Sequence, residues 1–91
     1  MTNDKKQPRG LEFPCRFPLK TIGKNNSDFQ TIVVDIVRRH VPELKDEEIS
    51  SRLSEDGKYI SITTTFTAES REQLDGLYYE LSSHELVMMV L

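Results

Sequence analysis

The dipeptide Asp56-Gly57 constrains the fold of this 91-residue chain more than any other short segment. It separates two strand-like runs, 49–54 and 58–66, and an Asp-Gly pair in that setting is the strongest short-range signal for a β-hairpin. A two-residue turn fixes the pairing register and places Leu53 opposite Ile60. The apolar side chains of both runs then fall on one face, which supports that register.

Two amphipathic helices are predicted, one before and one after the hairpin. Ser27 begins a Ser-x-x-Gln capping box, after which apolar residues recur at three- and four-residue steps over 29–40 until Pro42 ends the pattern. A second Ser-x-x-Gln box at 70–73 precedes another apolar stripe over 74–81. Both patterns are typical of helices that pack one face on a sheet.

Two further strands lie towards the ends of the chain. The first is predicted over 13–22, and its two prolines suggest an irregular early half. The last begins at about Leu86, and its residues Val87–Leu91 are all apolar. A half-exposed strand should alternate apolar and polar side chains, so the outward set here needs a cover. The inward set is either Val87, Met89 and Leu91 or Leu86, Met88 and Val90.

The predicted order of elements is β-α-β-β-α-β. Two β-α-β halves with right-handed crossovers interleave into a four-stranded antiparallel sheet with both helices on one face. This is the α+β ferredoxin-like sandwich, in which the first and third strands are central and the second and fourth are edges. We expect residues 1–10 to form a disordered tail and residues 11–91 to form a single domain.

Composition argues against several protein classes. The chain is 36% hydrophobic and 30% charged with a net charge of −3, whereas broad nucleic-acid binding needs a basic excess. No apolar run approaches the roughly 20 residues that span a bilayer. The start of the chain lacks the apolar segment of a signal peptide, and one cysteine excludes an internal disulfide. These features favour the cytoplasm.

No catalytic motif is present. Cys15 lies beside Arg16, a cation that could activate the thiol, but a small core residue is the favoured interpretation. His40 and His84 belong to different elements, and no metal-ligand spacing joins them to each other or to Cys15. We therefore expect no metal, no cofactor and no enzymatic activity.

The loop before the first helix is a candidate site for a small anionic metabolite, because helix N-termini favour negative charge. The alternative is a loop whose Gly and Asn residues only permit the turn, and that alternative is favoured. The candidate ligand-binding residues are Gly23, Lys24, Asn25, Asn26 and Ser27.

The open face of the sheet and the last strand are candidate surfaces for larger partners. The hairpin register places Arg52 and Tyr59 on the open face, and the first strand adds Arg16 and Lys20 if Phe17 and Leu19 point to the core. The candidates there are therefore Arg16, Lys20, Arg52 and Tyr59. RNA-recognition modules share this topology but stack bases on two or three aromatic residues, so a single tyrosine makes nucleic acid an unfavoured partner. The candidate partner-binding residues of the last strand are Met88, Met89, Val90 and Leu91.

Several segments together resemble the YbeD-like family of small bacterial cytosolic proteins without assigned activity. The matching segments are Glu12-Phe13-Pro14, Phe17, Lys20-Thr21-Ile22-Gly23, Arg39-His40-Val41-Pro42, Leu77-Tyr78-Tyr79-Glu80-Leu81 and Val87-Met88-Met89-Val90-Leu91. They cover nearly all of the chain after residue 10. The sequence departs from the family at Cys15-Arg16 and in its longer polar N-terminus. The resemblance implies a ferredoxin-like fold, similar to ACT-type regulatory domains, and a regulatory link to lipoate.

The first functional hypothesis is a non-enzymatic regulatory or adaptor domain that acts through a homodimer or a protein partner at its C-terminal edge strand. The second is binding of a small carboxylate effector at the 23–27 loop. An acylphosphatase-like enzyme would need an Arg-bearing phosphate loop after the first strand, and this loop contains Lys24, Asn25 and Asn26 but no Arg. Shared fold alone does not support that activity.

Overall fold

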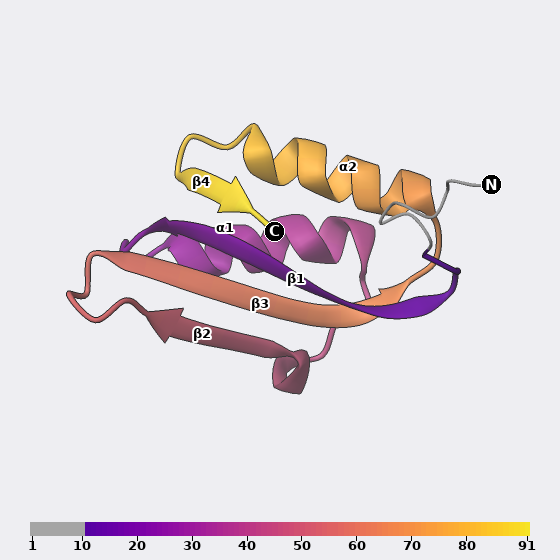
Figure 1. Cartoon of the computed structure of the whole chain (residues 1–91), viewed down its shortest axis with the longest axis horizontal. Helices are drawn as coiled ribbons and strands as arrows, with labels where there is room; N and C mark the ends of the chain where they lie inside the picture. Colours follow the sequence, from indigo (N-terminus) through magenta and orange to yellow (C-terminus); the bar gives the residue numbers. More distant parts are fainter. Residues whose placement is uncertain (1–10) are drawn as a thin grey trace.

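The computed structural model describes residues 11–91 of the protein, and the predicted disordered tail, 1–10, lies outside them. The elements are β1 (Cys15–Lys24), α1 (Phe29–His40), the short 3-10 helix η2 (Asp46–Glu48), β2 (Ile49–Leu53), β3 (Tyr59–Ala68), α2 (Arg71–Ser82) and β4 (Val87–Val90). The strands form one antiparallel sheet in the order β2-β3-β1-β4, and both helices cover the same face (Figure 1). The ferredoxin-like class is confirmed, and so is the predicted strand order, with the first and third strands central and the second and fourth at the edges.

The core lies between the sheet and the two helices. Leu19 of β1 and Ile62 of β3 are fully buried, and the helices bury a matching stripe. That stripe comprises Phe29, Val33 and Val37 of α1 and Leu74, Leu77 and Leu81 of α2. Each such side chain stabilises the fold by about 1.5–3 kcal/mol relative to its exposed state. The three- and four-residue spacing that predicts the helices is therefore the spacing of the core contacts.

The central pair β1–β3 is regular along its whole length, from Cys15 opposite Ala68 to Lys24 opposite Tyr59. The predicted irregular early half of the first strand is confirmed only at its start, where Phe13 and Pro14 lie in a bend before β1 begins at Cys15. Pro18 lies inside the regular pair. Lys20 exchanges both backbone hydrogen bonds with Leu91 on the β4 side. Pro18 is two residues earlier, so its backbone nitrogen faces the same side, away from β3. The missing N–H therefore costs the β1–β3 pair no hydrogen bond.

The hairpin has the predicted register but a different turn. Leu53 lies opposite Ile60 as expected. However, the Gly57 N–H donates to the Ser54 carbonyl and the Ser54 N–H donates to the Tyr59 carbonyl, so the loop has four residues, 55–58. Gly57 adopts φ 74°, the left-handed region that favours glycine. The predicted two-residue turn is wrong, yet both turns pair the same residues and the register is unaffected.

The Asp56 carboxylate holds the hairpin loop together. It accepts hydrogen bonds from the Ser54 hydroxyl at 2.7 Å and the Lys58 N–H at 3.0 Å. Both bonds stabilise the charged carboxylate and hold the pKa of Asp56 below its ordinary 3.8, and the bond from the Ser54 hydroxyl has the larger effect. Because the folded-state pKa is lowered, this contribution to stability is present above pH about 3.8 and is lost as the pH falls through the folded-state pKa.

The two helices begin differently, although the sequence predicts the same capping box for both. At α2 the Ser70 hydroxyl accepts from the Gln73 N–H at 3.1 Å, as predicted. At α1 the N-cap is Asp28, whose side chain makes no cap bond. The Asn26 side chain accepts from the Asp28 N–H at 2.8 Å instead. The predicted capping box at Ser27 is wrong because an asparagine turn organises this helix start.

The last strand does not alternate. Met89 lies opposite Ile22, but the next residue of β1, Gly23, lies opposite Val87, so Met88 is the extra residue of a β-bulge. Val87 and Val90 pack against the core, whereas Met88 and Met89 are 56% and 52% exposed. Neither predicted inward set is correct, because each assumed an uninterrupted period of two.

Gly23 allows β1, β4 and α1 to approach closely. A Cβ atom at this position would overlap the Leu86 carbonyl oxygen and the ring of Phe29, which is itself fully buried. A backbone atom and a packed ring have little room to move. The glycine is thus required by packing at this point of the fold.

Replacing Gly23 by alanine should lower the free energy of unfolding by about 1–3 kcal/mol, because the new methyl group overpacks the junction. Lys24→Ala is the matched control, since Lys24 is the next residue of β1 and its side chain is exposed, and it should change stability by less than about 0.5 kcal/mol. Urea unfolding monitored by circular dichroism measures both. Equal losses in the two variants would contradict the close packing at Gly23.

The helix caps provide a second test. Ser70→Ala should cost about 1 kcal/mol because it removes the acceptor for the Gln73 N–H. Ser27→Ala should cost less than about 0.5 kcal/mol, since Asn26 supplies the acceptor at α1. The same urea experiment compares them, and a larger loss for the Ser27 variant would show that α1 is capped by the predicted box.

Candidate functional site

Within residues 11–91, no helix covers the face of the sheet opposite α1 and α2, and we call it the open face (Figure 1). Its side chains form rows across the strands, since antiparallel partners lie side by side. One row contains Leu91, Lys20, Thr63 and Ser50, the next contains Met89, Ile22, Ser61 and Arg52, and a third contains Lys24 and Tyr59. The open face therefore joins residues predicted for two separate surfaces: cations and Tyr59 from the sheet, and Met89 and Leu91 from the last strand.

Charge on the strands is of one sign. The four strands carry Arg16, Lys20, Lys24 and Arg52 but no Asp or Glu. Yet the whole chain has 15 Asp and Glu against 12 Lys and Arg. An ordinary solvated face mixes both signs, whereas a single-sign field is typical of a surface that attracts a charged partner.

Arg16 is the one sheet cation with an ion pair within residues 11–91. Its guanidinium lies 2.9 Å from Glu48 of η2. The backbone N–H of Lys45 and then the Arg16 guanidinium lower the pKa of Glu48 from its ordinary 4.5. The other described ion pairs lie on the helices and η2 and leave Lys20 and Arg52 without a carboxylate partner. Free positive charge is thus concentrated in the half of the face next to the hairpin.

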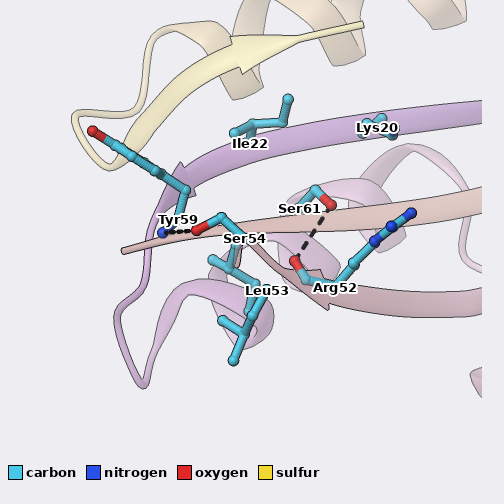
Figure 2. A pocket seen from close by; sticks show the side chains of 8 residues that line it. Lys20, Ile22, Arg52, Leu53, Ser54, Tyr59 and Ser61 are labelled. Atoms are coloured by element: carbon cyan, nitrogen blue, oxygen red, sulfur yellow. Dashed lines mark hydrogen bonds between the residues drawn. The ribbon is translucent and has the colours of Figure 1, made fainter. Parts of the chain in front are cut away.

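A shallow groove of about 270 Å³ lies in that half of the face. Figure 2 shows Lys20 and Ile22 on β1, Arg52 on β2, and Ser61 and Tyr59 on β3. The Ser61 hydroxyl donates a long hydrogen bond of 3.5 Å to the Arg52 carbonyl. Small hydroxyl side chains form the floor, and cations flank it.

The last strand adds an apolar border to this groove. Leu91 is 56% exposed and Met89 is 52% exposed, and they lie beside Lys20 and Ile22 respectively. Met88 is also exposed, but in the bulge, where it lines a hollow with Lys24, Glu85 and Leu86. Val90, predicted with the partner-binding set, packs inward against the core. The exposed apolar surface of this strand therefore comprises Met88, Met89 and Leu91.

Most of the loop predicted to bind an anion is engaged in internal contacts. Gly23 is buried beneath Phe29, and the Asn25 side chain donates to the Gly57 carbonyl at 3.0 Å. Asn26 organises the helix start, and the Asp28 carboxylate stands at the N-cap, where it opposes a second anion. Lys24 and Ser27 are exposed. Lys24 also borders a hollow of about 400 Å³ with Asn25, Gly57, Lys58 and Tyr59.

The residues considered for chemistry lie apart. Cys15 is partly buried against the core, as its favoured interpretation predicts. His40 contacts Glu80 of α2 at 2.8 Å, and the His84 ring accepts from the Leu86 N–H in the turn before β4. Among residues 11–91, no three His, Cys, Asp or Glu side chains gather in a way that could hold a metal ion.

Ile22 is absent from the predicted site, and Ser61, which the hairpin register places on the open face, is not among the predicted candidates. Ile22 follows the alternation of β1 and so belongs to the open face, but its apolar side chain gave no sign of a surface role. Ser61 is the residue that both Ile22 and Arg52 face. The predicted fold places the last strand beside the first, so the outward residues of β4 should adjoin Ile22. Which residues of β4 point outward depends on the bulge at Met88, and the sequence does not locate that bulge.

The sheet and helices have close counterparts among solved structures. Protein HP0495 from H. pylori matches with a TM-score of 0.69 at 16% identity, over 100% of this chain and 94% of that one. The ACT domain from GTP pyrophosphokinase of Chlorobium tepidum matches with a TM-score of 0.63 at 13% identity, over 84% of each chain. At these identities the likeness concerns the fold. No helix within residues 11–91 has the length and apolar character needed to cross a membrane.

Sequence relatives match over almost the full length. A UPF0250 protein from Chromobacterium violaceum is 44% identical over 89 residues, covering 98% of this chain and 99% of the relative. A UPF0250 protein from Neisseria gonorrhoeae is 43% identical over 91 residues, covering 100% of both. The resemblance to the YbeD-like proteins is confirmed. Residues 8–91 match the family model described as a protein of unknown function (DUF493), and the chain belongs to that family.

Proposed function

We propose that the protein is a non-enzymatic regulatory or adaptor domain that binds a protein partner, or a second copy of itself, on the open face of its sheet. One observation carries this proposal: Lys20 and Arg52, which have no carboxylate partner within residues 11–91, line the same groove that the exposed Met89 and Leu91 border. Protein interfaces combine exposed apolar side chains with polar and charged groups, and both kinds lie side by side on this face. The described residues offer no comparable grouping of nucleophile, acid and base.

The fold is compatible with a regulatory role. One similar solved structure is the ACT domain of a GTP pyrophosphokinase. Fold likeness alone is a weak argument, so the proposal depends on the surface itself. Met89 and Leu91 expose about half of their area although they adjoin the core strand β1. Covering them would remove apolar surface from water at about 25 cal/mol per Å².

Replacing both Met89 and Leu91 by serine should weaken association by about tenfold or more, because two apolar side chains are lost from the border of the groove. The matched control is Tyr79→Ser, since Tyr79 is 76% exposed on the outer face of α2. Sedimentation velocity measures self-association. Affinity capture from extract of the native organism, followed by mass spectrometry, measures partner binding.

Unfolding curves must first show that both serine variants are as stable as the parent, which their exposure leads us to expect. If the parent is monomeric and captures nothing that the Met89/Leu91 variant loses, the proposal is wrong. Loss of the same capture in the Tyr79 control would move the binding surface to α2.

A second candidate function is binding of a small anionic effector at the hairpin end of the molecule. The hollow of about 400 Å³ there is bordered by two lysines, Lys24 and Lys58, and is of a size suited to a small ligand. A carboxylic acid would pair with either ammonium group. The lipoate link implied by the YbeD-like resemblance belongs to this hypothesis.

Thermal-shift screening with carboxylic acids, lipoate among them, tests this second function. A binding acid at 100 times its Kd should stabilise the protein by about 2.7 kcal/mol. The Lys24→Gln, Lys58→Gln double variant should abolish the shift, whereas Arg71→Gln at the start of α2 should leave it unchanged. A flat response across the acids, or a shift that survives in the double variant, counts against this site.

A further inference from the structure

We propose that the open face takes an extended, acidic segment of a partner polypeptide, with carboxylates directed at Lys20 and Arg52 and an apolar side chain seated between them. This inference rests on the function proposed above and specifies its partner. The occupant is identified by charge complementarity, by the size of the groove and by the positions of the two cations on the sheet.

The groove has the dimensions of a side-chain site. Its volume of about 270 Å³ lies below the roughly 300–1,000 Å³ of sites that enclose a whole small molecule. Its floor is Ser61 of β3, with Ile22 of β1 beside it. An apolar side chain of a partner would contact Ile22. The exposed Met89, which pairs with Ile22 on β4, extends the apolar surface beyond the groove.

The two cations stand on opposite sides of this floor. Lys20 is on β1 and Arg52 is on β2, with β3 between them, and their positions differ by one row. Strand spacing of about 4.8 Å and a rise of about 3.3 Å per residue place their Cα atoms roughly 12 Å apart. In an extended peptide, side chains at i and i+4 share one face and are about 13 Å apart. Two carboxylates at that spacing, with an apolar residue midway, match the surface.

A second copy of the chain fits the open face poorly. A two-fold dimer brings the same patch of both subunits together. Because the strands carry cations and no Asp or Glu, such a face-to-face dimer would oppose like charges across the interface. A partner that supplies its own carboxylates removes this repulsion.

Nucleic acid also fits poorly. Polyanions are bound through many phosphate contacts, and a net charge of −3 opposes their approach. The open face of the described sheet has one exposed aromatic side chain, Tyr59, whereas single-stranded bases need several stacking platforms. A short segment with a few carboxylates experiences less long-range repulsion.

Amide NMR of the ¹⁵N-labelled full chain tests the inference with synthetic peptides. The probe is a nine-residue peptide with glutamates four residues apart and a leucine midway, in a serine and threonine background. Matched peptides replace both glutamates by glutamine, both by lysine, or the leucine by serine. A 12-nucleotide thymidine oligomer tests nucleic acid. We expect shifts in β1 and β3 near Lys20 and Ser61 for the glutamate–leucine peptide, with affinity at least about tenfold above each control.

Charge reversal supplies the sharper test. The K20E/R52E double variant should lose the acidic peptide and gain the lysine peptide, because the attraction then runs in the opposite sense. Its dispersed amide spectrum shows that it is folded, and K20Q/R52Q replaces it if it is not. R38Q/R71Q changes two cations on the helices and should bind the acidic peptide as the parent does.

Three results would overturn the inference. They are tighter binding of the thymidine oligomer, unchanged binding in K20E/R52E, and no binding of the acidic peptide. If the acidic peptide fails while the Met89/Leu91 variant still loses a captured partner or a dimer, the open face binds an occupant of different chemistry. In that case this inference fails and the function proposed above stands.

Discussion

The pairing of β1 with β3 is the interaction on which the rest of the structure depends. It joins the two β-α-β halves, since β1 belongs to one and β3 to the other, and its ten-residue register fixes which side chains face the helices. The same register places Lys20, Ile22 and Ser61 together on the other face. The core and the candidate site are therefore the two faces of one pair of strands. A one-residue shift in the β1–β3 register would move the side chains of both to the opposite face.

Local patterns in the sequence predict most of this fold. Strand alternation and helical spacing define the core, and the Asp56-Gly57 signal leads to the correct hairpin register although the turn differs. The failures concern local hydrogen bonding: Asn26 takes over the start of α1, and the bulge at Met88 interrupts β4. An all-apolar strand contains no contrast from which a bulge can be located.

The candidate site could be predicted in part. Arg52 and Tyr59 follow from the hairpin register and Lys20 from the alternation of the first strand. Their association with Met89 depends on where β4 pairs with β1, a contact between distant parts of the chain. The prediction of an anion site at the 23–27 loop is weakened for a different reason, because most of its residues make contacts that the sequence does not show. The helix N-terminus that follows suggests an anion site, whereas the close approach at Gly23 and the side-chain hydrogen bond of Asn25 give these residues packing roles.

The separation of charge in this molecule also has a kinetic consequence. The strands carry only cations, and every Asp and Glu of residues 11–91 lies in a helix, in η2 or in a loop, so the open face is positive in a chain of net charge −3. The field of such a face favours the orientations in which it meets an approaching negative body. Encounters would then begin with the open face already oriented, at a rate that falls as the Debye length shortens with added salt.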